Sequence, residues 1–203
     1  GFLLVDSGAT YMDGTTDITR TYPLGPLTED EKRFYTWTLQ SHIDLARAVW
    51  LDYCECKMID TIAREPLWRH LINYRCGTGH SVSFVGNVHE GPHALNSRNT
   101  TRMRPGMVVT DEPGVYETDL VGIRIENELV CVHKADNQYG TFLGFEPLMF
   151  VPIATSPILP GVLDKDEIAW LNDYHRQVFA KLAPHLNDEE RSWLAEKCAA
   201  IGC

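Results

Sequence analysis

The pattern of hydrophobic and polar positions predicts two strands at the start of the chain, over residues 2–6 and 15–22. A turn with glycines over residues 7–14 is expected to join them as a hairpin. Because side chains alternate between the two faces of a strand, Asp17 and Thr19 share one face of the second strand. The hairpin can therefore direct polar side chains into one cavity.

Helical spacing follows the hairpin. Thr28 and Glu31 form a capping box, which predicts the start of a helix that ends near residue 50. The apolar residues of this helix recur at broadly helical intervals and are expected to face the core: Phe34, Trp37, Ile43, Ala46 and Trp50. A second helix is expected from about Met58, and Pro66 should interrupt it. A fresh helical start would then carry the apolar residues Leu67, Trp68 and Leu71.

The middle of the chain contains a polar, glycine-rich stretch followed by segments with the pattern of strands. Residues 73–99 are rich in Gly, Ser, His and Asn, a composition typical of loops and short strands that carry side chains to a site. Three strands are expected next, at about 106–111, 122–133 and 141–152, with a polar loop at 134–140.

The tail of the chain is predicted to form two amphipathic helices. The first follows Asp164, and its apolar face carries Ile168, Leu171, Val178 and Leu182. Asn187 and Glu190 predict the start of the second helix. Strands and helices thus occur in separate runs along the chain, an order typical of an α+β fold.

Composition narrows the class of protein. The 203 residues, 44% of them hydrophobic, are enough to bury a core of ordinary domain size, and no stretch approaches the roughly 18 apolar residues that span a bilayer. A formal net charge of -10 without a local basic patch argues against a nucleic-acid or anionic-membrane partner. The six cysteines include no C-x-x-C pair, so we expect reduced thiols in a cytoplasmic protein.

Candidate chemistry lies in five short motifs. Their metal-binding side chains are Asp6 in VDSGA, Asp17 in TTDITRT, His80 in GTGH, Glu112 in DEPG and Glu126 in GIRIEN. Carboxylate ligands with a single imidazole suit divalent ions such as Mn²⁺, Co²⁺ or Zn²⁺. A carboxylate can bridge two such ions about 3.5–4 Å apart, and the pair can activate a water for hydrolysis. With no G-x-S-x-G elbow and no H-E-x-x-H helix to serve instead, the set predicts a two-metal hydrolase.

Each of these residues alone also has a simpler explanation. An aspartate before Ser-Gly is commonly a turn residue, Glu112 precedes Pro-Gly as in ordinary loops, and a lone histidine such as His80 is more often packed than ligating. Glu126 is different because Ile123 and Ile125 flank it, and a carboxylate buried among apolar neighbours without a cation is costly. The joint occurrence of all five favours the metal site.

The ordered motifs VDSGATYMDGTTDITRT, GTGH, NVHEGP, TDEPGVYE and GIRIENELV resemble the catalytic domain of the X-prolyl aminopeptidases (aminopeptidase P), in peptidase family M24 with methionine aminopeptidase and prolidase. The similarity continues through FEPLMFVPI and WLNDYH. It implies a pita-bread (creatinase/aminopeptidase) fold over residues 1–160 and a helical extension over 161–203. It also implies removal of an N-terminal residue from peptides with proline at the second position, using two divalent ions, usually Mn²⁺.

The resemblance also implies a role for each site residue. The ligands would be divided between two metals, with Asp6 and Asp17 on one, His80 and Glu112 on the other, and Asp17 and Glu126 bridging. Glu112 would also accept the proton of the attacking water. His89, in NVHEGP, matches a histidine that hydrogen-bonds the substrate or the developing oxyanion, and an ordinary loop histidine is the alternative.

The surroundings of the site match the family less completely. Tyr116 and Arg124 lie where the family has pocket residues and residues that support the ligands. Cys76, in CGTGH, stands where family members usually carry a histidine that helps to form the proline pocket. We therefore expect an altered rate or substrate preference, unless Cys76 only fills space as a small apolar group.

Two further expectations follow from the resemblance. The family's catalytic domain begins with a helix and a strand ahead of the DSG motif, and the full enzyme has preceding domains. We therefore expect this chain to be N-terminally truncated, with weak metal binding and poor hydrolysis on its own. The tail helices, with Trp170 and Trp193, would serve either a homodimer contact or local packing.

Three other functions share the motifs. A prolidase-like Xaa-Pro dipeptidase would use the same five ligands. Methionine aminopeptidase is less favoured, because the FEPL segment and the long tail point elsewhere. A non-catalytic pita-bread binding module would typically have lost ligands, and this chain keeps all five.

Overall fold

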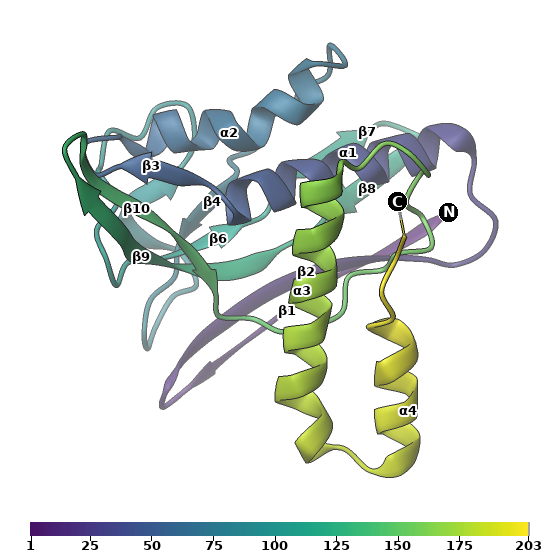
Figure 1. The fold of residues 1–203 in the computed structure, drawn as a ribbon. Helices are drawn as coiled ribbons and strands as arrows, with labels where there is room; N and C mark the ends of the chain where they lie inside the picture. Colours follow the sequence, from purple (N-terminus) through teal and green to yellow (C-terminus); the bar gives the residue numbers. More distant parts are fainter. Residues whose placement is uncertain (203) are drawn as a thin grey trace.

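Strands and helices follow one another in separate runs, as the α+β prediction requires (Figure 1). The computed structural model describes residues 1–202, and the thiol of Cys203 lies outside them. In chain order the elements are β1 (Phe2–Tyr11), β2 (Gly14–Pro23), α1 (Glu29–Ala46), β3 (Val49–Leu51), α2 (Cys56–Trp68), β4 (Gly79–Ser81), β5 (Glu90–Leu95), β6 (Val108–Asp111), β7 (Gly114–Glu117), β8 (Val121–Arg124), β9 (Asn127–Asn137), β10 (Gly140–Pro147), α3 (Lys165–Leu182), the 3-10 helix η1 (Ala183–His185) and α4 (Asp188–Lys197).

The strands pair into three antiparallel sheets. The largest has the order β3-β10-β9-β6-β4-β5, and the other two are the pairs β1-β2 and β7-β8. The β1-β2 pair is in register along its whole length, from Phe2 opposite Pro23 to Tyr11 opposite Gly14. Helices α1 and α2 lie on one side of the large sheet and the β1-β2 hairpin lies on the other (Figure 1). The candidate ligands therefore project between the hairpin and the sheet.

Two hydrophobic clusters hold these layers together. The first lies between the helices α1 and α2 and the large sheet and includes Leu45, Ile59 and Leu129, all fully or almost fully buried. The second joins α1 to the tail helices through residues such as Leu39 and Leu171. Burial of side chains of this size contributes about 1.5–3 kcal/mol each, so the clusters fix the relative positions of the elements that carry the site.

The predicted turn of the first hairpin was too long. Residues 7 and 8 continue β1, opposite Ile18 and Asp17, so the turn contains only Met12 and Asp13. The glycine at position 8 marks a close approach between strands: a Cβ there would lie 2.5 Å from the carbonyl oxygen of Thr16. Glycine in a strand can signal such a contact as well as a turn.

Two predictions in the later strands were also wrong. The polar segment 134–140 is not a loop, because β9 runs to Asn137 and β10 begins at Gly140. Polar residues can form a strand pair when both faces meet solvent, so polarity there reported exposure rather than a loop. The single strand expected over 122–133 is divided at Ile125 and Glu126 into β8 and β9. The strand β8 pairs with β7, whereas β9 pairs with β6.

The predicted capping box of Thr28 and Glu31 is confirmed, but the helix it begins ends at Ala46. Trp50, expected on that helix, lies in β3 and is still buried. The helix α2 runs through Pro66 rather than breaking there. Proline near the end of a helix removes few hydrogen bonds, and the Arg69 amide still donates to the Glu65 carbonyl at 3.1 Å.

After Trp68 the chain forms a turn rather than the fresh helix that was expected there. Leu71, expected on its apolar face, has a positive φ of 59° and is 97% exposed. Residues 73–99 contain loops and the short strands β4 and β5, as their composition predicted. Among residues 1–202, no helix combines the length and apolar character that crossing a membrane requires.

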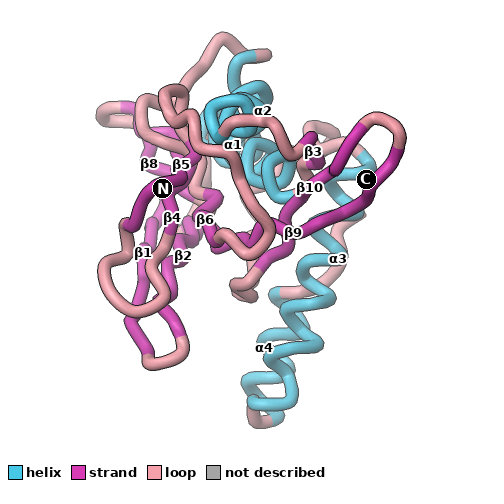
Figure 2. Tube along the Cα trace, turned by 90° about the vertical axis from the view of Figure 1, so that its left-hand side faces the viewer, coloured by secondary structure: helices cyan, strands magenta, loops and turns pink. Residues whose placement is uncertain are grey.

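The tail contains the two predicted helices, each begun by the expected cap residue, Asp164 for α3 and Asn187 for α4. They run side by side and project from the sheets (Figures 1 and 2). Trp170 stacks on Tyr174 with ring centroids 5.4 Å apart, which is local packing, whereas Trp193 is 56% exposed. The division of the chain at residue 160 stays a prediction, and so does a homodimer contact.

Candidate metal centre

A cavity of about 650 Å³ lies between the β1-β2 hairpin and the large sheet. All five predicted ligands and His89 line it. Its polar lining consists of Asp6, Thr10, Thr15, Thr16, Asp17, His80, His89, Glu112, Arg124 and Glu126. Residues from six separate stretches of the sequence therefore meet at one place, as the motifs predicted.

Three of the ligands form a compact group. Asp17, His80 and Glu126 each offer one donor atom, and these atoms lie within 4.8 Å of one another. The Nε2 atom of His80 is 3.5 Å from an oxygen of Asp17 and 3.1 Å from an oxygen of Glu112. Two carboxylate oxygens and an imidazole nitrogen are donors that suit Mn²⁺, Co²⁺ or Zn²⁺, so this group fits a divalent ion.

Strand pairing places His80 in the group. It lies on β4, which pairs with β6 on one side and β5 on the other. The preceding Gly79 makes this contact possible, because a Cβ there would lie 1.8 Å from the carbonyl oxygen of Thr110. The His80 Nδ1 lies 3.2 Å from the Ser81 carbonyl, so an Nδ1 proton donated there leaves Nε2 to act as a ligand.

The most deeply buried carboxylate of the site is Glu126, which is 1% exposed. Burial, together with the nearby Glu112 charge, raises the pKa of Glu126 to about 8. Burial and the charge of Asp6 likewise raise the pKa of Asp17. A divalent cation in the cavity would supply the charge that allows such carboxylates to remain ionised, which is a second indication that the donor set fits a metal.

Burial and hydrogen bonding act in opposite directions on His80. Burial alone would lower its pKa, but the hydrogen bonds to Glu112 and to the Ser81 carbonyl outweigh it, and the pKa is raised. The neighbouring carboxylates therefore stabilise the protonated imidazole, and a metal bound at Nε2 would compete with that proton.

Arg124 organises one wall of the cavity. Its Nη1 donates to the Tyr116 hydroxyl at 2.8 Å, its Nε donates to the Thr19 hydroxyl at 2.9 Å, and its Nη2 pairs with Asp6. The side chain of Asp6 is 53% exposed and lies against this arginine rather than in the three-donor group. Metal binding by Asp6 therefore stays a prediction, and so do the supporting roles of Tyr116 and Arg124.

His89 lies next to the group, with its ring 4.1 Å from the ring of His80 and nearly perpendicular to it. Residues 89–93 spell H-E-G-P-H, but they form a loop and the start of β5 instead of a helix. His89 and His93 consequently do not face the same site. His89 lies beside His80, whereas the ring of His93 contacts the Val108 carbonyl at 2.7 Å. Cys76 is exposed beside the site, with its sulfur 3.8 Å from the Gly114 carbonyl.

Two threonines act on the ligands without being singled out for that role by the motifs. The Thr110 hydroxyl donates to Glu112 at 2.9 Å and accepts from the His80 amide at 3.0 Å. The Thr19 hydroxyl donates to the Glu126 carboxylate. Both follow from strand alternation, since Thr110 lies two residues from Glu112 and Thr19 lies two residues from Asp17.

Residues 1–133 match metallopeptidase family M24, and residues 141–201 match the C-terminal region of peptidase M24. The chain belongs to metallopeptidase family M24. The family resemblance inferred from the motifs is thereby confirmed. Within this family, the chain is 42% identical over 205 residues to aminopeptidase P1 of Lotus japonicus, covering 98% of this chain and 31% of that protein.

Solved structures of M24 enzymes confirm the pita-bread fold. The X-prolyl aminopeptidase from Caenorhabditis elegans, described as a cytosolic enzyme with a di-nuclear active site, superposes with a TM-score of 0.93 at 40% identity, over 98% of this chain and 34% of that one. Prolidase from Pyrococcus furiosus superposes with a TM-score of 0.62 at 28% identity, over 72% and 40%. The chain spans about a third of the length of the curated relatives it matches.

Proposed function

We propose that this protein is a metal-dependent aminopeptidase that hydrolyses the bond between an N-terminal residue and a following proline. The observation that carries the proposal is that Asp17, His80 and Glu126 converge in a cavity that Glu112 and His89 also line. Relatives named aminopeptidase P at about 40% identity support the choice of reaction.

The proposed cofactor is a pair of divalent ions, Mn²⁺ in the first place and Co²⁺ or Zn²⁺ as alternatives. They would be held by Asp6, Asp17, His80, Glu112 and Glu126. When bound, such ions supply a water that loses its proton near neutral pH, and they polarise the carbonyl group of the substrate. The di-nuclear site described for the Caenorhabditis elegans enzyme supports the number of ions.

The protein's own groups would complete the reaction. Glu112 would take the proton from the attacking water, with the Thr110 hydroxyl orienting one of its oxygens. His89 would donate a hydrogen bond to the substrate oxygen as negative charge develops on it. Arg124, tied to Asp6 and Tyr116, would keep this wall of the cavity in place for the substrate.

Peptide length separates this proposal from the prolidase alternative, which the similarity to the Pyrococcus furiosus enzyme favours. With Mn²⁺ present, we expect release of the first residue from an Xaa-Pro-Xaa tripeptide at least about tenfold faster than cleavage of an Xaa-Pro dipeptide. The measurement is kcat/KM for both peptides under the same conditions. Preference for the dipeptide would replace the proposal with prolidase activity. No cleavage of either peptide by the full-length protein, together with no bound divalent metal, would favour a binding module.

Restoring a histidine at position 76 should improve substrate binding. Cys76 offers a weak donor, and burial raises the pKa of its thiol, so the neutral thiol dominates near pH 7. We expect Cys76→His to lower KM for an Xaa-Pro-Xaa peptide about fivefold, the effect of one added hydrogen bond. Cys198→His, at a half-buried cysteine in the tail, is the control and should leave KM unchanged. An unchanged KM would show that the residue only fills space.

The cytosol is the proposed compartment. The Caenorhabditis elegans relative is described as cytosolic, and Cys54, Cys56, Cys76, Cys131 and Cys198 are all free thiols. A homodimer is proposed as well, with the exposed Trp193 of α4 as a candidate contact. Sedimentation of the purified protein at several concentrations would test it.

A further inference from the structure

Behind the candidate metal centre lies a buried arginine, Arg20, which has no charged partner among residues 1–202. Arg20 is 3% exposed and follows Thr19 on β2. Its guanidinium donates only to neutral groups: the carbonyls of Thr19, Glu126, Val151 and Pro152, the side-chain oxygen of Asn127 and the hydroxyl of Tyr174. Burial of a cation is tolerated when its donors are satisfied in this way, so the position of Arg20 is strongly determined by its partners.

The partners of Arg20 connect the two segments that carry the most buried ligands. One nitrogen, Nη1, donates both to the Thr19 carbonyl on β2, at 2.9 Å, and to the Glu126 carbonyl. The Glu126 amide in turn donates to the same Thr19 carbonyl at 3.1 Å. The backbone of Glu126 is thus tied to the strand that carries Asp17, which limits how far these two residues can move apart.

The other side of the guanidinium is held by the tail helix α3. Its Nη2 donates to the Tyr174 hydroxyl at 2.9 Å and to the Val151 carbonyl at 2.7 Å. The Tyr174 hydroxyl also accepts from the Val151 amide at 3.2 Å and lies 3.2 Å from the side-chain oxygen of Asn127, the residue after Glu126. The helix α3 is therefore connected to Glu126 by two successive hydrogen bonds, from Arg20 to the Tyr174 hydroxyl and from Arg20 to the Glu126 carbonyl.

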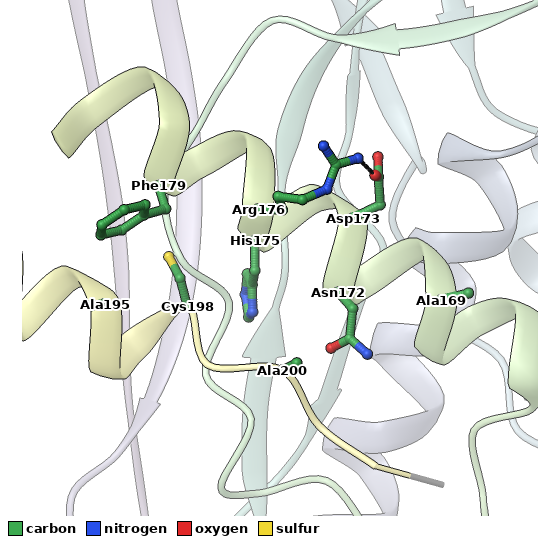
Figure 3. Close-up of a pocket in the computed structure, with 9 residues that line it drawn as sticks. All are labelled: Ala169, Asn172, Asp173, His175, Arg176, Phe179, Ala195, Cys198 and Ala200. Carbon is green, nitrogen blue, oxygen red and sulfur yellow. Dashed lines mark hydrogen bonds and ion pairs between the residues drawn. The ribbon is translucent and has the colours of Figure 1, made fainter. Parts of the chain in front are cut away.

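The neighbouring His175 strengthens the attachment. Its Nε2 accepts from the Ile153 amide at 3.1 Å. The helix α3 therefore holds residues 151–153 at two points, and the carbonyls of Val151 and Pro152 in this segment accept from Arg20. On its far side His175 lines an open cavity of about 590 Å³ bounded by Phe179 and Cys198, where α3 faces α4 and the segment after it (Figure 3). The hydrogen bonds of Tyr174 and His175 add directional contacts to the apolar packing of α3 against α1.

We propose that Arg20 and Tyr174 are positioning residues that couple the C-terminal helix α3 to Glu126, the buried carboxylate of the candidate metal centre. This inference rests on the proposed function only in that Glu126 binds metal. Neither residue lines the cavity, so both act through the Glu126 backbone rather than on the substrate. The C-terminal helix α3 would then contribute to the geometry of the metal centre, because a displacement of α3 would shift Glu126.

The test compares two buried tyrosines that differ in their partners. Tyr174→Phe removes the hydroxyl on Arg20, whereas Tyr35→Phe removes an equally buried hydroxyl that donates to the Ala154 carbonyl at 2.7 Å instead. We expect both variants of the purified protein to lower the urea midpoint of unfolding to a similar extent. Only Tyr174→Phe should weaken Mn²⁺ binding, by about tenfold, the lower end of the effect of removing an outer-shell partner. Calorimetric titration with Mn²⁺ measures it.

Amide exchange makes the result independent of the metal proposal. In metal-free protein we expect Tyr174→Phe to speed hydrogen exchange of the Glu126 amide about fivefold more than Tyr35→Phe does, as loss of one supporting hydrogen bond would. Equal effects of the two variants on Mn²⁺ affinity and on this amide would overturn the coupling. If the parent protein took up no Mn²⁺ while the exchange difference persisted, the metal site would fail and the coupling would stand.

Discussion

Replacing Glu126 with glutamine is expected to weaken Mn²⁺ binding more than a hundredfold and to reduce hydrolysis of Xaa-Pro-Xaa peptides by at least as much. Loss of a group outside the ligand shell costs 10–100-fold, and the proposed function places Glu126 in the shell itself. Its carboxylate would help to hold the ions, and a neutral amide supplies neither the charge nor the second strong oxygen donor. Calorimetry with Mn²⁺ and kcat/KM with a tripeptide measure the two effects.

Folding should survive this substitution. The raised pKa of Glu126, about 8 because of burial and the Glu112 charge, means that the metal-free protein carries a neutral acid there at pH 7. Glutamine is neutral and of the same shape, and it keeps an acceptor for the Thr19 hydroxyl. The metal-free melting temperature should therefore be unchanged or higher.

The matched control for this prediction is Glu117→Gln at an exposed position of β7. That variant removes the same charge away from the cavity lining, so its Mn²⁺ affinity should stay within about twofold of the parent, as for screened surface charges. A Glu126→Gln variant that binds Mn²⁺ within tenfold of the parent would remove Glu126 from the ligand set.

The convergence of the candidate ligands in one cavity could be predicted because its signals are local. Each ligand belongs to a short motif with a glycine or a strand end, and the family resemblance supplied the order of the motifs. Helix starts were predictable for the same reason: a cap residue and the glutamate three residues later lie within one turn, as at Thr28, Asp164 and Asn187.

What the sequence left open depends on tertiary contacts. The pairing of Asp6 with Arg124 joins residues far apart in the chain. The division of the 122–133 strand at Glu126 arises because β8 and β9 belong to different sheets. Polarity could not distinguish the solvent-exposed β9-β10 hairpin from a loop, since it reports exposure and not hydrogen bonding.

Acid should destabilise this protein through His175. The imidazole is fully buried, and burial, with the Arg20 charge second, lowers its pKa to about 4 from an ordinary value near 6.5. As pH falls below about 6.5, His175 becomes protonated in the unfolded chain, whereas in the folded protein it stays neutral until about pH 4. The contribution is therefore fully present above pH 6.5 and is lost between there and pH 4, by about 3 kcal/mol at 1.36 kcal/mol per pKa unit.

Comparison with His175→Gln isolates this effect from the buried acids, whose raised pKa values act in the opposite direction. Glutamine keeps an acceptor for the Ile153 amide but takes up no proton. Urea unfolding at pH 7 and at pH 4 should show the variant gaining about 3 kcal/mol relative to the parent as pH falls. His185→Gln, at an exposed histidine in η1, should change the pH dependence little. If the free energy of unfolding changed with pH equally in the parent and in His175→Gln, the pKa of His175 would not be lowered in the folded protein. The hydrogen bond that its Nε2 accepts from the Ile153 amide would then be lost at low pH.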